Sequence, residues 1–271
     1  MQKIRLTPHE VDEVARFMRQ ESGNDFSDKR TLVAAKMGTL CGSAGYRHFW
    51  ELWDAAKGTG IASAQLRQQI VDELTTNYSF FYRESAHFDA LGALISSGEV
   101  PVRAGGLRVW SAGCATGEEA YNLAMAIEDA RRSTSFLGEY HIVGSDISSR
   151  AIGVASRARY DVANVARMPP HWRNLYCVQD GQGYQIREVV RRHVTFRRES
   201  VLAPRPDMPY DVVVCRNMII YFDQESIERF VAVLRGRVAA GGYLFLGHTE
   251  IMGSIDGFAY VAPSIWRRDA G

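Results

Sequence analysis

The sequence predicts an α/β protein with two parts: a small all-helical N-terminal domain and a doubly wound, Rossmann-like domain that carries a small antiparallel β insertion. Three observations lead to this prediction. Residues 1 to about 80 contain no convincing strand, whereas from Leu107 onward short apolar runs alternate with amphipathic segments. Such alternation is typical of a parallel sheet covered by helices. One segment, at about 160–196, interrupts the alternation.

The N-terminal part is predicted to contain four helices. Thr7 and Glu10 have the spacing of a capping box, and Pro8 stands at the first helical position. The sequence Ser22-Gly-Asn24 ends this helix, whose inward face carries Val11, Val14, Ala15 and Met18. The other three helices are expected at Asp28–Leu40, Tyr46–Ala56 and Ser63–Asn77.

The second part begins with a strand, a glycine turn and a helix. The strand is expected at Val109–Ser111, the turn at Ser111–Gly117 and the helix at Glu118–Ala130. The run Tyr210–Cys215 is almost wholly apolar, as expected of a parallel strand buried on both faces. The other expected elements are a strand at Tyr140–Asp146, a helix at Ile147–Ala158, a helix capped by Asp223 that runs to Ala239 before Gly241-Gly242, a strand at Tyr243–Gly247 and a hairpin of Phe258–Val261 with Ile265–Arg267.

The insertion lies between Tyr160 and Phe196. Asp180-Gly181 and Gly183 mark a hairpin turn within it, and Val194–Phe196 is expected to be its last strand. Such a small antiparallel flap is suited to cover a site or to bind a partner. The alternative is a long loop without either function.

Composition limits the classes of function. The chain has 271 residues, 46% of them hydrophobic and 23% charged, which is ordinary for a globular protein. The net charge of +1 gives no basic field for nucleic acid or an anionic membrane. No apolar run approaches the roughly 20 residues that span a bilayer, and the N-terminus lacks the apolar segment of a signal peptide. The four cysteines have no metal-ligand spacing and are expected to be reduced thiols of a cytoplasmic protein: Cys41, Cys114, Cys177 and Cys215.

The glycine turn indicates a cofactor without phosphates. Only Gly113 and Gly117 stand in the turn, whereas the dinucleotide fingerprint has three glycines. Glu118 and Glu119 follow, and their charge would repel a pyrophosphate at the helix N-terminus. S-adenosylmethionine carries an amine and a sulfonium and no phosphate, so it suits this turn better. The alternative is that the two glutamates only stabilise the first helical turn, which we expect of one of them.

Further candidate residues follow other segments. Asp146 ends the second strand, where it is placed to accept hydrogen bonds from ribose hydroxyls or, alternatively, to cap the next helix. Asn217 follows a buried strand, and Tyr221 is placed either to reach a reacting centre or to pack. Arg83 stands among aromatic residues in the segment Asn77–Ser85, so it needs an anionic partner.

Five segments resemble, in the same order, the CheR family of chemotaxis-receptor glutamate methyltransferases. They cover most of the chain and are Asn77–Glu84, Val109–Glu119, Gly144–Ile147, Cys215–Phe222 and Gly242–Glu250. The resemblance implies a helical receptor-docking domain (1–76), a linker that contributes to the active site (77–90) and a methyltransferase domain (91–271) with a β-subdomain at about 160–196. It implies transfer of a methyl group from S-adenosylmethionine to glutamate side chains of a chemoreceptor-type protein. From the composition we expect a cytoplasmic enzyme that neither binds nucleic acid nor inserts into a membrane. A monomer is the default expectation.

The resemblance also implies which residues form the site. Cofactor contacts carry over to Asn77, Ser79, Arg83, Glu119, Asp146, Ser200, Val201, Asn217 and Met218. A glutamate carboxylate is already ionised at neutral pH, so no general base is required. Arg83 is therefore expected to orient this carboxylate through a bidentate pair, and Tyr221 is expected to line its path. No metal is expected.

The sequence departs from the family at several points. Ser79 stands where threonine is usual, and Ser200 stands where asparagine is common. The resemblance implies an arginine-rich second helix that docks an acidic receptor surface. Here that helix keeps only the cations Lys29, Arg30 and Lys36, and Gly38 weakens it. An alternative acceptor is therefore a receptor of a chemosensory-like pathway that controls something other than swimming. The basic run Arg187–Arg198 is an alternative docking surface or a solvated edge.

Three rival hypotheses remain. A methyltransferase of a small molecule would not need the helical domain. A nicotinamide-dependent oxidoreductase conflicts with Glu118-Glu119 and with the glycine spacing. A non-catalytic chemosensory binding module would not need Arg83, Glu119, Asp146 and Asn217 to be intact.

Overall fold

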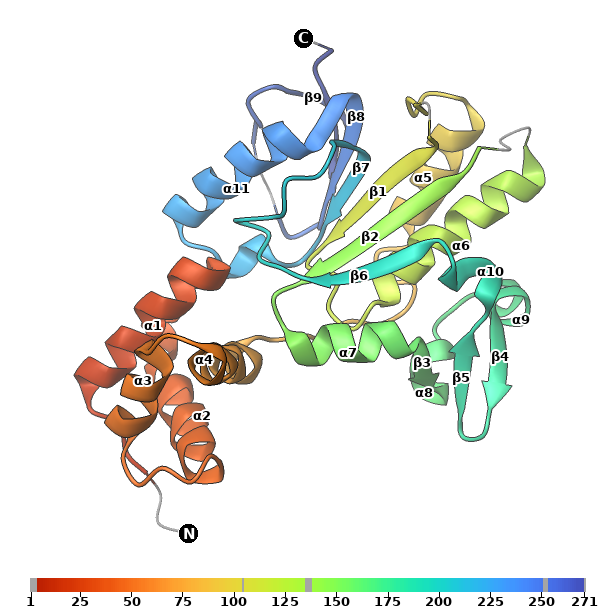
Figure 1. Cartoon of the computed structure of the whole chain (residues 1–271). Helices are drawn as coiled ribbons and strands as arrows, with labels where there is room; N and C mark the ends of the chain where they lie inside the picture. Colours follow the sequence, from red (N-terminus) through yellow and green to blue (C-terminus); the bar gives the residue numbers. More distant parts are fainter. Residues whose placement is uncertain (1–3, 104, 135–137, 251–252, 271) are drawn as a thin grey trace.

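The computed structural model describes residues 4–103, 105–134, 138–250 and 253–270. A cluster of helices at the N-terminal end lies beside a larger domain built on a mostly parallel sheet (Figure 1). This arrangement confirms the predicted fold class.

The N-terminal helices are α1 (Pro8–Ser22), η1 (Ser27–Lys29), α2 (Arg30–Ser43), α3 (Phe49–Lys57) and α4 (Ile61–Leu74). The predicted capping box is present, because the Thr7 side chain accepts from Glu10 N and Glu10 accepts from Thr7 N at 2.7 Å. Gly23 ends α1 in the left-handed conformation, with φ of 78°. The amphipathic faces meet in one core around Val14, Met18 and Met37.

Gly38 lowers the helix propensity of α2, but it is needed for packing against the N-terminal segment. A Cβ atom at this position would lie 2.5 Å from the carbonyl oxygen of Ile4. The glycine therefore lets the segment before α1 pack against α2.

The main sheet has seven strands in the order β6-β2-β1-β7-β8-β10-β9, and the first five are parallel. Their bounds are β1 (Leu107–Ala112), β2 (Tyr140–Asp146), β6 (Val194–Arg198), β7 (Tyr210–Cys215), β8 (Val238–Leu246), β9 (Phe258–Ala262) and β10 (Ile265–Arg268). The predicted closing hairpin is confirmed, since β9 and β10 pair antiparallel.

One predicted boundary is wrong. β8 begins at Val238, so Gly241 and Gly242 lie inside the strand and do not separate it from the helix. The pairing of β7 with β8 shifts register here, Gly241 has φ of 74°, and a Cβ at Gly242 would meet Asp211 O at 2.8 Å. The glycines therefore allow an irregularity within the strand.

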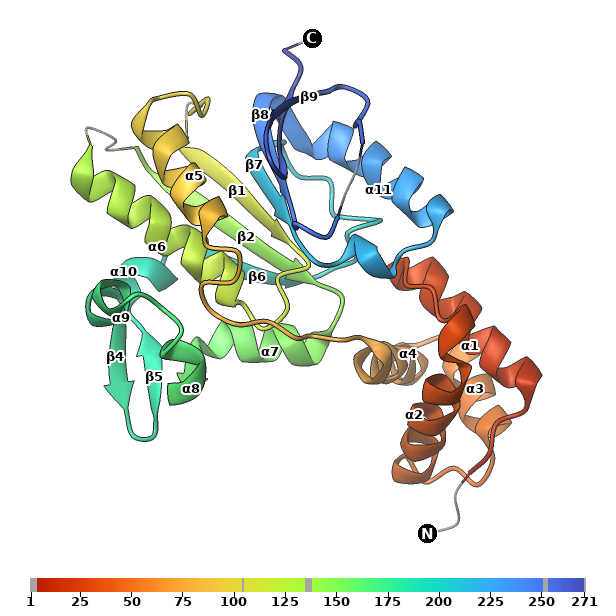
Figure 2. The same cartoon turned by 180° about the vertical axis from the view of Figure 1, so that it is seen from behind.

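Helices cover both faces of the sheet. They are α5 (Ala86–Ser96), α6 (Glu118–Ser133), α7 (Ser149–Arg157) and α11 (Gln224–Arg237). Successive β1 residues enter different cores: Val109 packs with α5 and α6, and Trp110 packs with Phe230 and Leu234 of α11. The view from behind shows α5 and α6 in front of the strands and α11 beyond them (Figure 2). The sheet is thus doubly wound, although α5 was not predicted.

The insertion is a three-stranded antiparallel sheet of β3 (Arg159–Asp161), β5 (Gly183–Ile186) and β4 (Cys177–Asp180), in the spatial order β3-β5-β4. The predicted turn at Asp180-Gly181 joins β4 to β5. Short helices α8 (Val162–Val165), α9 (Pro170–Tyr176) and α10 (Glu188–Arg191) accompany it. Val194–Phe196 was expected here, but it lies in β6 of the main sheet, where Val194 pairs with Ile142.

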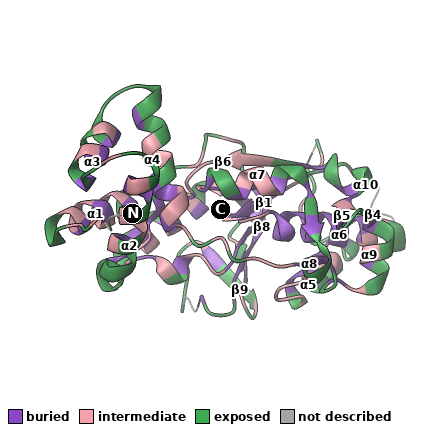
Figure 3. Ribbon diagram, turned by 90° about the horizontal axis from the view of Figure 1, so that it is seen from below, coloured by how far each residue is buried: buried purple, intermediate pink, exposed green. Residues whose placement is uncertain are grey.

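The helical domain contacts the sheet domain in several places, among them η2 (Ile219–Tyr221) and α7. Beside η2, Asp25 N donates to Tyr221 O at 2.7 Å, and Arg19 pairs with Asp223, the N-cap of α11, at 2.9 Å. Beside α7, Ser149 N donates to Asp72 at 2.8 Å. Seen from below, exposed residues cover the outer sides of both parts (Figure 3). The contacts place the helical domain over the carboxyl ends of the strands.

Gly117 provides a test of the glycine turn. It has φ of 94°, and a Cβ there would lie 2.7 Å from Ala155 Cβ and 3.0 Å from Ala155 Cα. Gly117→Ala is therefore expected to lower the free energy of unfolding by about 2–3 kcal/mol, because the backbone strain and the clash add. Urea denaturation measures this change.

Gly236 is the matched control. It lies within α11 without positive φ, and its Cβ would meet nothing within 4 Å. Gly236→Ala should raise stability by roughly 1 kcal/mol through helix propensity. Equal effects of the two substitutions would contradict the packing assigned to Gly117.

Candidate active site

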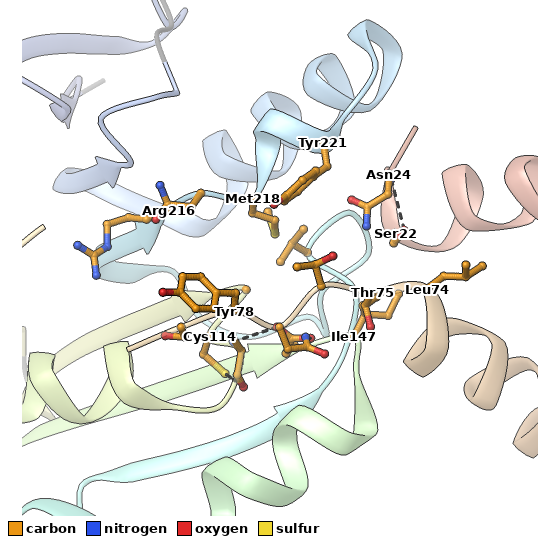
Figure 4. A pocket seen from close by; sticks show the side chains of 18 of the residues that line it. Ser22, Asn24, Leu74, Thr75, Tyr78, Cys114, Ile147, Arg216, Met218 and Tyr221 are labelled. Carbon is orange, nitrogen blue, oxygen red and sulfur yellow. Dashed lines mark hydrogen bonds between the residues drawn. The ribbon is translucent and has the colours of Figure 1, made fainter. Parts of the chain in front are cut away.

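A cavity lies where the helical domain meets the carboxyl ends of β1, β2 and β7 (Figure 4). Its empty space is about 1100 Å³, part of which is open solvent. A cavity at this edge of a parallel sheet is the usual place for a ligand. The structure brings all of the predicted site residues to its wall: Asn77, Ser79, Arg83, Glu119, Asp146, Ser200, Val201, Asn217, Met218 and Tyr221.

The two glutamates after the glycine turn have different environments. Glu118 accepts hydrogen bonds from Thr116 Oγ1 at 2.7 Å and Asn164 Nδ2 at 2.8 Å, and it does not line the cavity. Glu119 lines it, accepting from Ser111 Oγ at 2.6 Å and from Arg216 Nε at 2.7 Å. The structural task expected of one glutamate therefore falls on Glu118, and Glu119 is the one that a ligand can meet.

Asp146 ends β2 at the floor of the cavity and is 8% exposed. Its carboxylate accepts from Ala115 N at 3.0 Å and from Ser148 N at 2.8 Å, and Asn77 Nδ2 donates to it at 3.5 Å. Burial raises the pKa of Asp146 above its ordinary value, and these backbone donors oppose the rise. The N-cap of α7 is Ser148, so Asp146 does not serve as the cap. A carboxylate has about four acceptor positions, which leaves capacity for a ligand hydroxyl.

The loop after β7 is held in an unusual conformation. Asn217 has φ of 57°, and its side-chain amide donates to Glu84 Oε1 at 3.0 Å. Glu250 is 4% exposed and accepts from the backbone nitrogens of Met218 at 2.6 Å and Ile219 at 2.9 Å. Sequence reasoning missed Glu250, although it closes one of the family segments. Its carboxylate fixes the loop that presents Asn217 and Met218.

Arg83 lies half-buried in the strap between α4 and α5. One guanidinium nitrogen donates to Tyr78 O at 3.3 Å, and the group lies over the Phe80 ring at 5.7 Å. Among the described residues, no carboxylate lies within 4.0 Å of it. Its neighbours Tyr82 and Glu84 both have positive φ, at 65° and 51°, which is uncommon for side chains of this size. The predicted anionic partner is thus absent from the described chain, and Arg83 is available to a ligand.

Tyr221 and Ser200 lie at the side of the helical domain. Lys29 Nζ stands 4.9 Å from the centre of the Tyr221 ring, and both residues line the cavity. The Ser200 hydroxyl donates to the backbone oxygen of Glu21 at 2.7 Å. The hydroxyl proton of Ser200 is therefore used in a contact between the two domains.

Two of the three cations predicted in the second helix, Arg30 and Lys36, have polar partners within the chain. Arg30 pairs with Asp12 and donates to Pro8 O, and Lys36 donates to Glu73 O. In the basic run, Arg187 binds Cys177 O of β4, Arg197 pairs with Asp207 in the loop before β7, and Arg198 binds Gln68 of α4, so these arginines contact three different segments.

Glu84, His87 and His248 offer ligand atoms within 4.8 Å of one another. The Arg216 guanidinium lies 3.5 Å from His87 Nδ1 and 3.8 Å from Glu84. A positive charge at this distance disfavours a metal cation.

His87 makes stability sensitive to acid. Burial, with a further contribution from Arg216, lowers the pKa of His87 to about 4 from 6.5. Between these pH values the unfolded chain binds a proton that the folded chain does not, so stability is complete above pH 6.5 and falls toward pH 4. At pH 5 the expected loss is about 2 kcal/mol relative to pH 7.5.

The measurement is urea unfolding at both pH values for the wild type and for His87→Phe. This variant keeps a ring against Phe245, whose ring centre lies 5.6 Å from that of His87. Its loss of stability between pH 7.5 and pH 5 should be smaller by about 2 kcal/mol. An identical loss in both proteins would contradict the assignment.

The fold and the site define a class, and comparison with known proteins supports it. Residues 77–265 match the family model described as "CheR methyltransferase, SAM binding domain". The chain is therefore an S-adenosylmethionine-dependent methyltransferase. None of the helices in the described ranges has the length and hydropathy to span a membrane.

Similar proteins carry related names. A "Chemotaxis protein methyltransferase" of Borreliella burgdorferi is 25% identical over 98% of this chain and 96% of its own length. "Chemotaxis protein methyltransferase 1" of Pseudomonas aeruginosa is 29% identical, covering 84% of this chain and 85% of its own. A third "Chemotaxis protein methyltransferase", from Listeria monocytogenes, is 32% identical over 69% of this chain and 70% of its own length. The chain belongs to the CheR methyltransferase family.

Proposed function

We propose that the chain transfers a methyl group from S-adenosylmethionine to glutamate side chains of a chemoreceptor-type protein and forms glutamyl methyl esters. The names of the relatives support the receptor as acceptor. The observation that carries the proposal is Arg83, a cation on the cavity wall that has no carboxylate partner among the described residues. A carboxylate acceptor would supply that partner.

The cavity residues fit the cofactor. S-adenosylmethionine supplies a methyl group on a sulfonium together with an amine and two ribose hydroxyls. Asp146 would accept from the ribose hydroxyls, and Glu119 would accept from the amine. Asn77, Ser79, Ser200, Val201, Asn217 and Met218 complete the wall around it.

The chemistry needs little more than orientation. A glutamate carboxylate is ionised at neutral pH and attacks the methyl carbon in line with the bond to sulfur, so no protein base is required. An anion and a sulfonium become a neutral ester and a thioether, and a cavity that excludes water favours this loss of charge. Holding the two reactants in line can supply most of the remaining acceleration. We assign this orientation to Arg83, and the path of the acceptor to Tyr221.

We assign residues 1–76 to receptor docking, 77–90 to the linker that carries Arg83, and 91–271 to the methyltransferase domain. Its β-subdomain runs from β3 to α10, at 159–191, because the predicted last strand of the insertion lies in the main sheet. Arg30 and Lys36 have partners within the chain. We therefore expect receptor docking by this chain to depend less on acidic receptor residues than docking through a dense basic stripe would. We propose a cytoplasmic monomer that acts on the cytoplasmic part of its receptor.

The direct test is methyl transfer to a receptor. A cytoplasmic receptor fragment is incubated with enzyme and S-adenosylmethionine labelled in the methyl group. Label that is released as methanol by alkali shows an ester, whereas alkali-stable label shows transfer to another atom. Label that appears only in added small carboxylic acids would favour the small-molecule alternative. S-adenosylmethionine binding without any transfer would favour a non-catalytic module.

Tyr221 has a separate test. Tyr221→Phe removes only the hydroxyl from the cavity wall, and we expect kcat to fall about tenfold, the loss typical of one hydrogen bond to a charged group. Tyr210→Phe is the control. The Tyr210 hydroxyl donates to Asp207 at a distance of 2.9 Å, and Tyr210 does not line the cavity. Unimpaired transfer by Tyr221→Phe would restrict Tyr221 to packing.

A further inference from the structure

The guanidinium of Arg216 is a buried charge in the wall of the cavity, and it has several hydrogen-bond partners. Arg216 follows β7, and its side chain is 3% exposed. Its Nε donates to Glu119 Oε2 at 2.7 Å, and one terminal nitrogen donates to the backbone oxygen of Arg83 at 2.7 Å. The rigid guanidinium of Arg216 therefore joins the carboxylate of Glu119, assigned to the cofactor, to the backbone of Arg83, assigned to the acceptor.

The turn that Arg216 holds is strained. Tyr82 and Glu84 have φ of 65° and 51°, so both neighbours of Arg83 lie in the left-handed region. Such conformations cost of order 1–3 kcal/mol each and persist only where surrounding contacts determine them. The same terminal nitrogen of Arg216 also lies 3.4 Å from Glu84 O. Arg216 thus binds the carbonyl groups that this turn directs inward.

Lysine could not make this set of contacts. The planar guanidinium presents donors in a fixed fork, so one side reaches Glu119 while the other reaches the turn. Its flat face also packs on the ring of Phe88 at 5.1 Å. A lysine would keep the charge and lose the fork.

We infer that Arg216 is a positioning residue that locks the Arg83 turn against Glu119, and so sets the distance between the acceptor-binding cation and the cofactor-binding carboxylate. The inference rests on the proposed function because it assigns the acceptor to Arg83. In Arg216→Lys, the charge opposite Glu119 remains while the turn is released. Cofactor affinity should then survive while the alignment of the acceptor is lost.

The first experiment separates these two effects. For Arg216→Lys we expect kcat to fall about 100-fold, the scale of a small misplacement of a reactant. The Kd of S-adenosylhomocysteine, measured by calorimetry, should stay within about threefold. Arg103→Lys is the matched control. Arg103 pairs with the buried Asp211 outside the cavity, so both values should stay at wild type. Equal losses of kcat and cofactor affinity in Arg216→Lys would overturn the inference.

A second experiment separates positioning from charge compensation. Arg216→Met alone leaves Glu119 as an unpaired buried charge, whereas the double variant with Glu119→Gln removes both charges. Thermal stability of the double variant should return to near that of Glu119→Gln. Its kcat at saturating S-adenosylmethionine should stay about 100-fold below that of Glu119→Gln, since the turn is still free. A kcat equal to that of Glu119→Gln would show that Arg216 only balances charge.

A third measurement does not depend on activity. Backbone amide hydrogen exchange over residues 80–87 should speed up in Arg216→Lys and not in Arg103→Lys. Unchanged protection would overturn the inference even if the enzyme is active. Faster exchange in a protein that methylates no receptor would uphold the lock and instead reject the proposed acceptor.

Discussion

Replacing Arg83 with alanine is expected to lower kcat/KM for the receptor by about 100- to 1000-fold while S-adenosylhomocysteine binds within about tenfold of wild type. The acceptor carboxylate loses a charge-assisted bidentate partner and, with it, its alignment toward the methyl group. The cofactor keeps its contacts with Asp146 and Glu119. Steady-state transfer of labelled methyl to the receptor fragment, together with calorimetry, measures both values.

Arg167 offers a matched control for this experiment. Its guanidinium lies 4.3 Å from the centre of the same Phe80 ring, but it does not line the cavity. Arg167→Ala therefore removes a similar cation from the same aromatic surface and should leave turnover unchanged. The kcat/KM of Arg83→Lys should lie between those of wild type and Arg83→Ala, because lysine keeps the positive charge but lacks the forked donors of the guanidinium. Full turnover and unchanged affinities in Arg83→Ala would remove Arg83 from the mechanism.

Asp146→Ala should weaken binding of S-adenosylhomocysteine by 100-fold or more. Hydrogen bonds to a charged group contribute about 1.5–3 kcal/mol each, and the ribose offers two hydroxyls. The substitution also frees Ala115 N and Ser148 N, which Asp146 holds in the floor of the cavity. Calorimetry on the purified variant gives the affinity, and its thermal unfolding shows whether the fold is retained.

Asp211 is the control for loss of a buried carboxylate. It is fully buried near the start of β7, where it accepts from Arg108 N at 2.9 Å, outside the cavity. Asp211→Ala should lower stability and leave the affinity for S-adenosylhomocysteine at wild type. Tight binding by Asp146→Ala would show that the ribose lies elsewhere.

Features encoded by local sequence were predicted correctly. β2 and β7 have the predicted bounds, because each contains buried β-branched residues that are typical of a parallel strand: Ile142-Val143 in β2 and Val212–Val214 in β7. The capping box at Thr7 and the N-cap at Asp223 are also as predicted, since each depends on side chains only three residues apart.

Features that depend on distant residues were missed or misplaced. α5 was not predicted, because no side-chain cap at Ser85 marks its start and its packing against α6 joins segments that are apart in the sequence. Val194 was assigned to the insertion because its pairing with Ile142 joins residues far apart in the chain. Such pairings follow from the topology of the sheet, which local patterns do not contain.

The site was predictable as a set of residues but not as a network. The strand ends pointed to Glu119, Asp146 and Asn217, and the structure brings these to one cavity. Arg216 was passed over because its partner Glu119 lies 97 residues earlier in the sequence. The positive φ of Asn217 and the burial of Glu250 likewise appear only when the loops meet.

We propose that one cavity holds the cofactor against Asp146 and Glu119 and leaves its sulfur facing Arg83. A crystal structure of the enzyme with S-adenosylhomocysteine tests this claim most directly. We expect the ribose hydroxyls to lie within hydrogen-bonding distance of Asp146, the amine to lie at Glu119, and open space for a carboxylate to remain between the sulfur and Arg83. A ligand bound outside this cavity, or one whose sulfur faces away from Arg83, would contradict it.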